Sequence, residues 1–338
     1  MANDNANNAT KSETAEAQLD LDPQDAAVAD AVLDEEAKAI DGNNKAEGEF
    51  KRTGRMTLYV RRFFRRPSAV VGLVMLILLV IFALVGSKFG KWHYEDLDFL
   101  SLGTAPNADH WFGTTGGGSD MYAMVVRGLG RSLAIGIISS IGTTILAAII
   151  GTSIAFFQGW VERIGMWILD MLLVVPSFLL IAMIVRSSAG MSGWLWLIFG
   201  LVAFGWIGYA RVLRTLTMSL RELDYVRAAK FMGVGSFRII LRHLVPNLGS
   251  VLIINTVLGV VGAVSSETSL SFLGLGIKAP DTSLGTLLND GQSVVLTAPW
   301  VLIFPSIVLI MVTFSVQLIG DGLRDAIDPY SRSGGKAK

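Results

Sequence analysis

The residues that could carry out chemistry are few, and they are scattered along the chain. Residues 116–118 are three consecutive glycines, a composition that could cradle a phosphate with backbone N–H groups. A phosphate-binding loop also requires a lysine followed by serine or threonine directly after its glycines. No such pair follows this run, and Lys11-Ser12 has no glycine before it. We therefore expect a flexible turn at 116–118 and no nucleotide site in this chain.

Metal-binding and nucleophilic chemistry are equally poorly supported. His93, His110 and His243 are too far apart in the sequence to suggest a metal site, and we interpret each as a surface residue. The chain contains no cysteine, which excludes disulfides and thiolate metal ligands. No grouping of nucleophile, base and acid emerges. The sequence thus predicts no enzyme activity and no catalytic, cofactor-binding or metal-binding residues.

Two acidic residues lie within long apolar runs. Asp170 is about two helical turns inside its run, where an unpaired charge would cost roughly 2.5–3.5 kcal/mol, so it should face protein or water. It could serve a proton relay or a helix-packing interface. Glu267, near the end of another run, could line a pathway or cap the structure. Pro176 removes a backbone hydrogen bond from the middle of the run that contains Asp170, and should kink that helix.

The apolar runs themselves define the class of protein. The chain is 52% hydrophobic and 17% charged, whereas charged residues make up about a quarter of soluble domains. A membrane-spanning helix needs about 20 apolar residues, and helices satisfy every backbone group in lipid. Runs of this length cover 68–87, 132–161, 164–185, 187–210, 244–266 and 291–320. The sequence therefore predicts an all-α membrane protein with six transmembrane helices.

Charge is distributed very unevenly along the chain. Residues 1–50 contain thirteen acidic residues and three lysines, with no aromatic residue before Phe50, and we interpret them as a disordered acidic tail. Basic residues concentrate before the first span and between the fourth and fifth spans, at Arg61, Arg62, Arg65, Arg66, Arg211, Arg214, Arg221, Arg227, Lys230, Arg238 and Arg242. The positive-inside rule then places both flanks, and both termini, in the cytoplasm.

The basic segment between the fourth and fifth spans has a helix–turn–helix pattern. We expect a short helix with Asp224 as N-cap, ended by Gly233 in the left-handed conformation, and a second helix capped by Ser236. Pro246 suits the first turn of the fifth span. In the second helix, the apolar residues Phe237, Ile240, Leu241 and Leu244 share one face, opposite Arg238 and Arg242. A solvated basic loop is the alternative interpretation.

The spacing of this segment resembles a known motif. Arg227-Ala228-Ala229, three further residues, Gly233, nine residues and His243-Leu244-Val245-Pro246 are similar to the EAA loop of ABC importer permeases, with Arg227 in place of the usual Glu. The resemblance implies a coupling helix that docks on an ATPase subunit, with Ala228 and Ala229 slim enough to enter a groove. The residues implied in coupling are Asp224, Tyr225, Arg227, Ala228, Ala229, Gly233, Ser236 and Pro246.

Other motifs narrow the resemblance. Residues 58–330 are similar to the C-type permease of dipeptide and oligopeptide (peptide/nickel) importers, through the motifs DMLLVVPSFLL, ETSLSFLGLG and GDGLRDAIDP. The stretch from Gly113 to Leu133 matches that family only in part, because Thr115, Ser119 and Met124 replace its usual charged residues. The resemblance implies the type I ABC importer permease fold.

This resemblance also implies a function and a set of partners. The expected function is to form half of a translocation pathway for di- or oligopeptides in a bacterial cell membrane. The expected partners are a homologous second permease, two ATP-binding cassette subunits and an extracytoplasmic binding protein, with no nucleic acid and no cofactor. Nickel complexes and glutathione are alternative substrates. A self-contained secondary transporter or channel is the alternative class, which would favour inverted repeats and several midplane ionisable groups.

The expected organisation has four parts. Residues 1–50 form the acidic cytoplasmic tail, and residues 51–131 form an amphipathic lead-in, the first span and an outer loop. Residues 132–325 form the permease core with five spans, including a cytoplasmic coupling loop at 211–247. Residues 326–338 form a cytoplasmic C-terminal tail.

Overall fold

The structure, a computed structural model, describes residues 55–187 and 193–327. The predicted acidic tail at 1–50 lies outside the described residues, as does the predicted C-terminal tail from residue 328 onwards. The described helices are α2 (Arg55–Phe64), α3 (Pro67–Val85), η1 (Gly86–Lys88), α4 (Met121–Phe157), α5 (Gly159–Val174), α6 (Ser177–Ser187), α7 (Gly193–Arg221), α8 (Asp224–Phe231), α9 (Ser236–Ile239), η2 (Ile240–Leu244), α10 (Val245–Asn247), α11 (Gly249–Phe272), α12 (Leu284–Ser293) and α13 (Trp300–Ile327).

The membrane-spanning helices are found where long apolar runs predicted them. Five continuous helices, namely α3 with η1, α4, α7, α11 and α13, are long and apolar enough to cross a membrane. A sixth span is formed if α5 and α6 are taken together as one broken helix, bent by 72°. The break falls at Val175 and Pro176, where the proline was expected to kink the span. The all-α membrane fold with six spans is thus confirmed, with one span broken.

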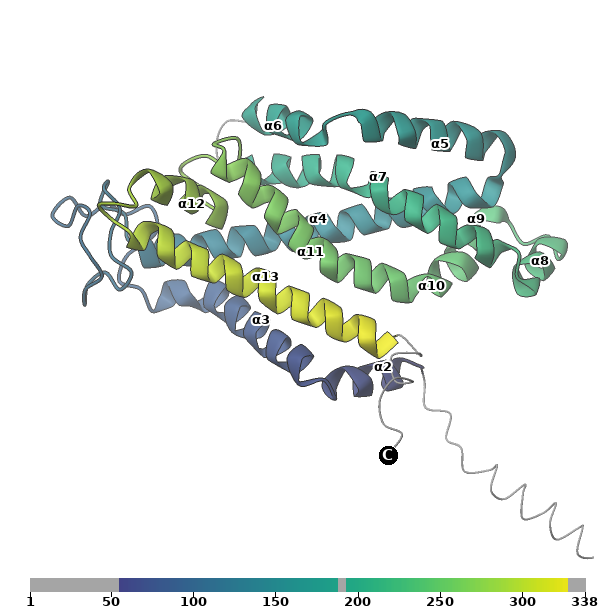
Figure 1. The fold of residues 1–338 in the computed structure, drawn as a ribbon, viewed down its shortest axis with the longest axis horizontal. Helices are drawn as coiled ribbons and strands as arrows, with labels where there is room; N and C mark the ends of the chain where they lie inside the picture. The colour runs from purple at the N-terminus through teal and green to yellow at the C-terminus, as the bar shows by residue number, and fades with distance from the viewer. Residues whose placement is uncertain (1–54, 188–192, 328–338) are drawn as a thin grey trace, which may run out of the picture. The chain divides into compact units, whose positions relative to one another are not determined.

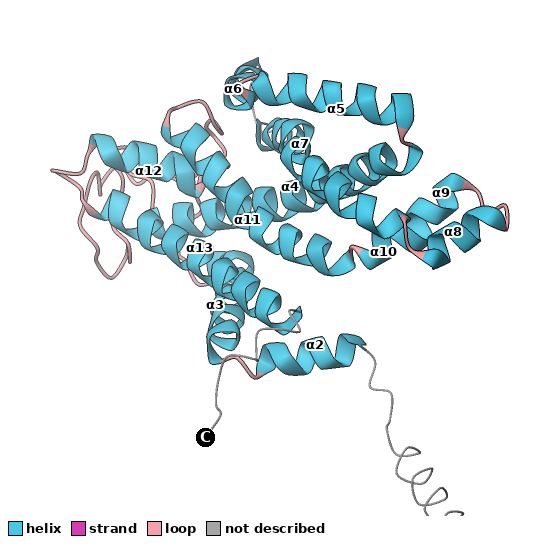
Figure 2. Ribbon diagram, turned by 45° about the vertical axis from the view of Figure 1, so that its right-hand side comes forward, coloured by secondary structure: helices cyan, strands magenta, loops and turns pink. Residues whose placement is uncertain are grey.

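Helix α4 is the central element of the fold. It packs against α7 on one side and against α11 on another, while α3 packs against α13 (Figure 1, Figure 2). The α4–α7 contact is close because Gly151 faces the backbone of Ala210, and a Cβ at Gly151 would lie 2.5 Å from the Ala210 carbonyl oxygen. Small residues allow membrane helices to approach in this way, and van der Waals packing then holds them together.

Helix α4 begins eleven residues earlier than the predicted span, at Met121 rather than 132. Asp120 is its N-cap and accepts a hydrogen bond from the Ala123 N–H at 2.9 Å. The two arginines in this added segment, Arg127 and Arg131, ended the apolar run in the sequence but do not end the helix. Both form ion pairs with Asp281 in the folded chain.

Three other boundaries differ from the apolar runs. Helix α7 begins at 193 rather than 187 and continues to Arg221, so the first eleven residues of the predicted coupling loop are helical. Helix α13 begins at 300 rather than 291. The residues just before it include α12, a short helix with a capping box between Ser283 and Thr286, where only a loop was predicted. A helix can continue past the hydrocarbon region because its backbone bonds are internal, which explains why α7 extends beyond residue 210.

Candidate functional site

The segment with the coupling-loop pattern forms a helical hairpin beyond the end of α7 (Figure 1). Helix α8 ends at Phe231, and Gly233 follows with φ +76°, the left-handed conformation predicted for it. The N–H of Val234 donates to the Ala229 carbonyl at 3.1 Å, which closes the turn. The chain then returns through α9, η2 and α10 into α11.

The two predicted N-caps are wrong. Helix α8 begins at Asp224 with Leu223 in the N-cap position, and α9 begins at Ser236 with Gly235 in that position. Neither helix has a side-chain capping hydrogen bond. Pro246 lies in the first turn of the short helix α10, just before the fifth span, rather than in the span itself. Tyr225 is held by a hydrogen bond of 2.8 Å from the Asn247 amide, which links α8 to α10.

The predicted apolar face of the second helix is right for Ile240 and Leu244 but wrong for Phe237 and Leu241. Ile239, Ile240 and Leu244 are buried, whereas Phe237 and Leu241 are exposed. The reason is that residues 240–244 form a π-helical turn, whose wider winding changes which side chains share a face. The buried side chains pack against Val226 and Ala229 of α8. Ala229 is therefore 3% exposed and faces this chain's own second helix, while Ala228 remains exposed.

The hairpin exposes three large apolar side chains that were not predicted from the sequence as a contact surface. We define the apolar tip as Phe231, Met232 and Phe237, whose exposed fractions are 92%, 75% and 64%. The sequence Lys230-Phe231-Met232 could have predicted this exposed surface, because it places two large apolar residues beside a basic one in a charged loop. Single exposed apolar residues need no explanation, but a cluster of three on a short hairpin indicates a contact surface.

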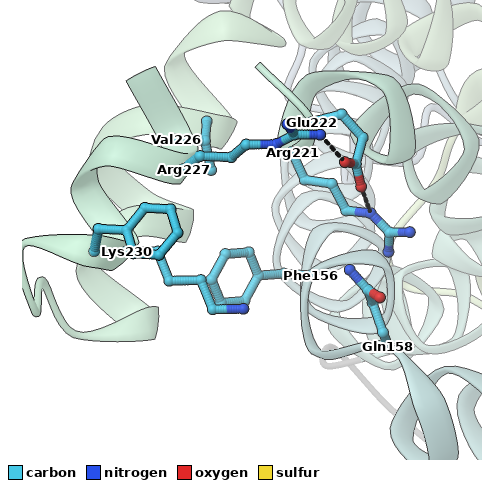
Figure 3. A pocket seen from close by; sticks show the side chains of 8 residues that line it. Phe156, Gln158, Arg221, Glu222, Val226, Arg227 and Lys230 are labelled. Carbon is cyan, nitrogen blue, oxygen red and sulfur yellow. Dashed lines mark hydrogen bonds and ion pairs between the residues drawn. The ribbon is translucent and has the colours of Figure 1, made fainter. Parts of the chain in front are cut away.

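A groove of about 650 Å³ lies between the hairpin and the ends of α4 and α7 (Figure 3). Glu222 bridges two arginines there: Arg227 donates to its Oε2 at 2.7 Å and Arg221 donates to its Oε1 at 3.2 Å. These bonds hold the pKa of Glu222 below its usual value, and the bond that Arg227 donates to Glu222 raises the pKa of Arg227. Phe156 and Lys230 also line the groove. The groove is therefore lined by the apolar side chains of Phe156, Val226 and Phe231 together with basic residues.

Asp170 does not stand alone in its span. Its Oδ1 lies 3.2 Å from a guanidinium nitrogen of Arg211 on α7, and both side chains are about half exposed. A second pair, Glu162 with Arg214, joins the same two helices nearby. Two ion pairs therefore join α5 to α7. They favour a helix-packing role for Asp170 over a proton relay.

Glu267 is fully buried at the opposite end of the fold from the hairpin. Its carboxylate accepts hydrogen bonds from the hydroxyls of Ser132 at 3.0 Å, Ser271 at 2.8 Å and Ser283 at 2.5 Å. These donors come from α4, α11 and the residue before α12. Since Glu267 has no accessible surface within this chain, the structural interpretation is favoured over pathway lining.

The loop before α4 buries a histidine that was predicted to lie at the surface. His110, interpreted as a surface residue, is 1% exposed. Its Nδ1 lies 2.9 Å from Asp120 and its Nε2 lies 3.3 Å from Asp98, while the Trp92 ring stacks on it. Among the described residues, no group of three or more potential ligands could hold a metal ion.

The fold and this site define a polytopic α-helical membrane protein with a helical hairpin exposed at one end. Residues 144–333 match the model of the binding-protein-dependent transport system inner membrane component family, and residues 55–106 match the N-terminal TM domain of oligopeptide transport permease C. The chain belongs to the family of binding-protein-dependent transport system inner membrane components. This membership confirms the resemblance seen in the sequence.

Relatives of known name cover most of the chain. The oligopeptide transport system permease protein OppC of Mycobacterium tuberculosis is 45% identical over 279 residues, 82% of this chain and 96% of that protein. OppC of Bacillus subtilis is 34% identical over 272 residues, 80% of this chain and 88% of that protein. The glutathione transport system permease protein GsiD of Pectobacterium atrosepticum is 32% identical over 275 residues, 81% of this chain and 90% of that protein.

Proposed function

We propose that this chain is the C-type permease subunit of an ATP-driven oligopeptide importer. Two relatives named as oligopeptide permeases, at 45% and 34% identity, support peptides as the substrate. A relative named as a glutathione permease is 32% identical, so glutathione, a small peptide, is the second candidate substrate. The chain would form half of the pathway, beside a homologous permease and beneath an extracytoplasmic binding protein.

The proposed energy-coupling surface is the apolar tip of the hairpin. Its three large side chains are exposed at the end of a rigid hairpin, whose own core is closed by Val226, Ala229 and Ile240. Burying a large apolar side chain in a partner's groove stabilises the contact by roughly 1.5–3 kcal/mol. The basic residues Arg227 and Lys230 would favour an acidic border on that groove. We infer that the partner is an ATPase subunit.

The proposed docking surface also sets the orientation of the chain in the membrane. An ATPase that consumes cytoplasmic ATP must meet the hairpin in the cytoplasm, and the arginines around the hairpin agree with the positive-inside rule. The opposite end, with the loop 89–120 and α12, would then face the binding protein outside. Both termini would be cytoplasmic.

Removing the apolar tip tests the proposed docking. In the double variant Phe231→Ser/Met232→Ser, both side chains are lost without opening the hairpin core, so membrane insertion should be unchanged. The ATPase recovered by pull-down from membranes should fall at least tenfold, because burying each side chain contributes roughly 1.5–3 kcal/mol. Peptide uptake should fall in parallel.

The matched control is Leu100→Ser. Leu100 is 97% exposed and lies in the loop 89–120, at the end of the fold opposite α8 (Figure 1). This variant should keep wild-type ATPase recovery. Wild-type recovery and uptake in the double variant would show that the hairpin is a solvated basic loop. Uptake that persists with no ATPase at all would favour a secondary transporter or channel.

A further inference from the structure

An apolar groove runs along the exposed side of α3 and α13. It has a volume of about 520 Å³ and is lined by Val70, Val71, Val74, Met75, Leu78, Leu79 and Phe82 of α3, with Val308 and Met311 of α13. Val71, Val74 and Leu78 are 57%, 50% and 60% exposed, so this chain leaves the groove open. The α3 residues recur at helical spacing and form one continuous stripe.

The length of the groove corresponds to one lipid leaflet. From Val70 to Phe82 a helix advances about 18 Å at 1.5 Å per residue. One leaflet of the hydrocarbon core is about 15 Å deep, half of the total thickness of about 30 Å. A single acyl chain that enters at the Val70 end would therefore be covered along its whole length.

Arg66 lies at the end of the groove that begins at Val70. Arg66 is the N-cap residue of α3, and the Val70 N–H donates to its carbonyl at 3.2 Å. The Arg66 guanidinium lies 3.0 Å from Asp325 in the last turn of α13. Arg66 thus joins the two helices that form the groove. Phe63 is buried beside Ala69 and holds the preceding segment in place.

Three further arginines stand at this end without an acidic partner. In the part of the chain that the structure describes, Arg61, Arg62 and Arg65 take part in no ion pair. The nearby acids are already engaged, because Asp325 pairs with Arg66 and Asp321 accepts a hydrogen bond from Gln317. The segment that leads into α3 at this end of the groove therefore has an excess of positive charge.

We propose that the α3–α13 groove with Arg61, Arg62 and Arg65 is a binding site for an anionic phospholipid. The groove receives one acyl chain, and the arginines bind the headgroup phosphate by charge-assisted hydrogen bonds. A second protein subunit would need acidic side chains opposite the arginines as well as an apolar ridge, so a phosphate-bearing lipid fits both features more simply. The site selects lipid of the leaflet that faces the arginine end.

The test uses the intact transporter, purified with its partner subunits in mild detergent. Bound lipid is counted by native mass spectrometry, and the thermal midpoint is measured with added dioleoyl phosphatidylglycerol, dioleoyl phosphatidylcholine or inorganic phosphate. The headgroup variant is Arg61→Gln/Arg62→Gln/Arg65→Gln, and its control is Arg238→Gln/Arg242→Gln in the hairpin. The groove variant is Val74→Trp, and its control is Ile77→Trp, which is half-exposed on α3 but does not line the groove.

The expected results separate headgroup from acyl-chain binding. The wild type and both controls should retain phosphatidylglycerol and gain thermal stability from it, but not from phosphatidylcholine or phosphate. The headgroup variant should bind phosphatidylglycerol on the order of tenfold to a hundredfold more weakly, since each arginine contributes about fivefold. Val74→Trp should lose the bound lipid.

Three outcomes would overturn the proposal. Equal binding of both lipids by the wild type would remove the headgroup selection. Stabilisation by inorganic phosphate alone would indicate a simple anion site. Loss of the second permease subunit in Val74→Trp, but not in Ile77→Trp, would show that the groove is a subunit interface.

Discussion

At the scale of single residues, Gly233 determines the geometry of the hairpin. Its φ of +76° lies in the left-handed region, and a Cβ built on it would meet nothing within 4 Å. A side chain there would therefore cost backbone strain and no steric clash. For an alanine this strain is roughly 1–2 kcal/mol.

Gly233→Ala is expected to loosen the hairpin without affecting the spans. Because the strain corresponds to about a 5–30-fold change in an equilibrium, amide hydrogen exchange across residues 224–235 should accelerate by about that factor. The matched control is Gly235→Ala, since Gly235 has φ −57° and equally open surroundings. Equal exchange rates in the two variants would mean that the conformation of Gly233 does not hold the turn.

At the scale of elements, Asp281 connects α4 to the loop before α12. It lies 3.0 Å from the Nε of Arg127 and 2.7 Å from the Nε of Arg131, and its side chain is 3% exposed. The two arginines also cover the rings of Tyr94 and Trp194. One carboxylate thus pairs with two cations in the first turns of a transmembrane helix and offsets one of their two charges.

Asp281→Asn is expected to destabilise this end of the fold. Removing one partner of a buried pair costs about 3–5 kcal/mol, and the partial exposure of the arginines reduces this to roughly 2–3 kcal/mol. The thermal midpoint of the purified complex should fall accordingly. The control is Asp290→Asn, because Asp290 is exposed and makes no ion pair among the described residues. A fall of the same size in both variants would contradict the role of the ion pairs.

At the scale of the whole molecule, the proposed orientation in the membrane can be tested by labelling single introduced cysteines, because the chain contains no native cysteine. Ala108 and Ser236 are exposed at opposite ends of the described fold. In intact cells, Ala108→Cys should react with an impermeant thiol reagent and Ser236→Cys should not. After the cells are opened, both should react. The reverse pattern in intact cells would invert the topology and remove the basis for cytoplasmic ATPase docking.

The sequence by itself determined the features that depend on local chemistry. The apolar runs predicted the spans because crossing lipid requires about 20 apolar residues wherever they later pack. Pro176 predicted the break between α5 and α6, since proline removes a backbone hydrogen bond in any context. Gly233 predicted a left-handed turn because the absence of a Cβ is a property of the residue alone.

Only the tertiary structure decided which side chains meet. Ala229 was expected to face a partner but packs on Ile240, and the exposed large apolar side chains are those of the apolar tip, Phe231, Met232 and Phe237. Ala229 packs with Ile239, Ile240 and Leu244 of the returning segment, and nothing in the local pattern specified this contact. Arg127 and Arg131 ended an apolar run in the sequence, yet Asp281, some 150 positions away, allows them to continue a helix. Such pairings depend on contacts between distant segments, which only the packed helices bring together.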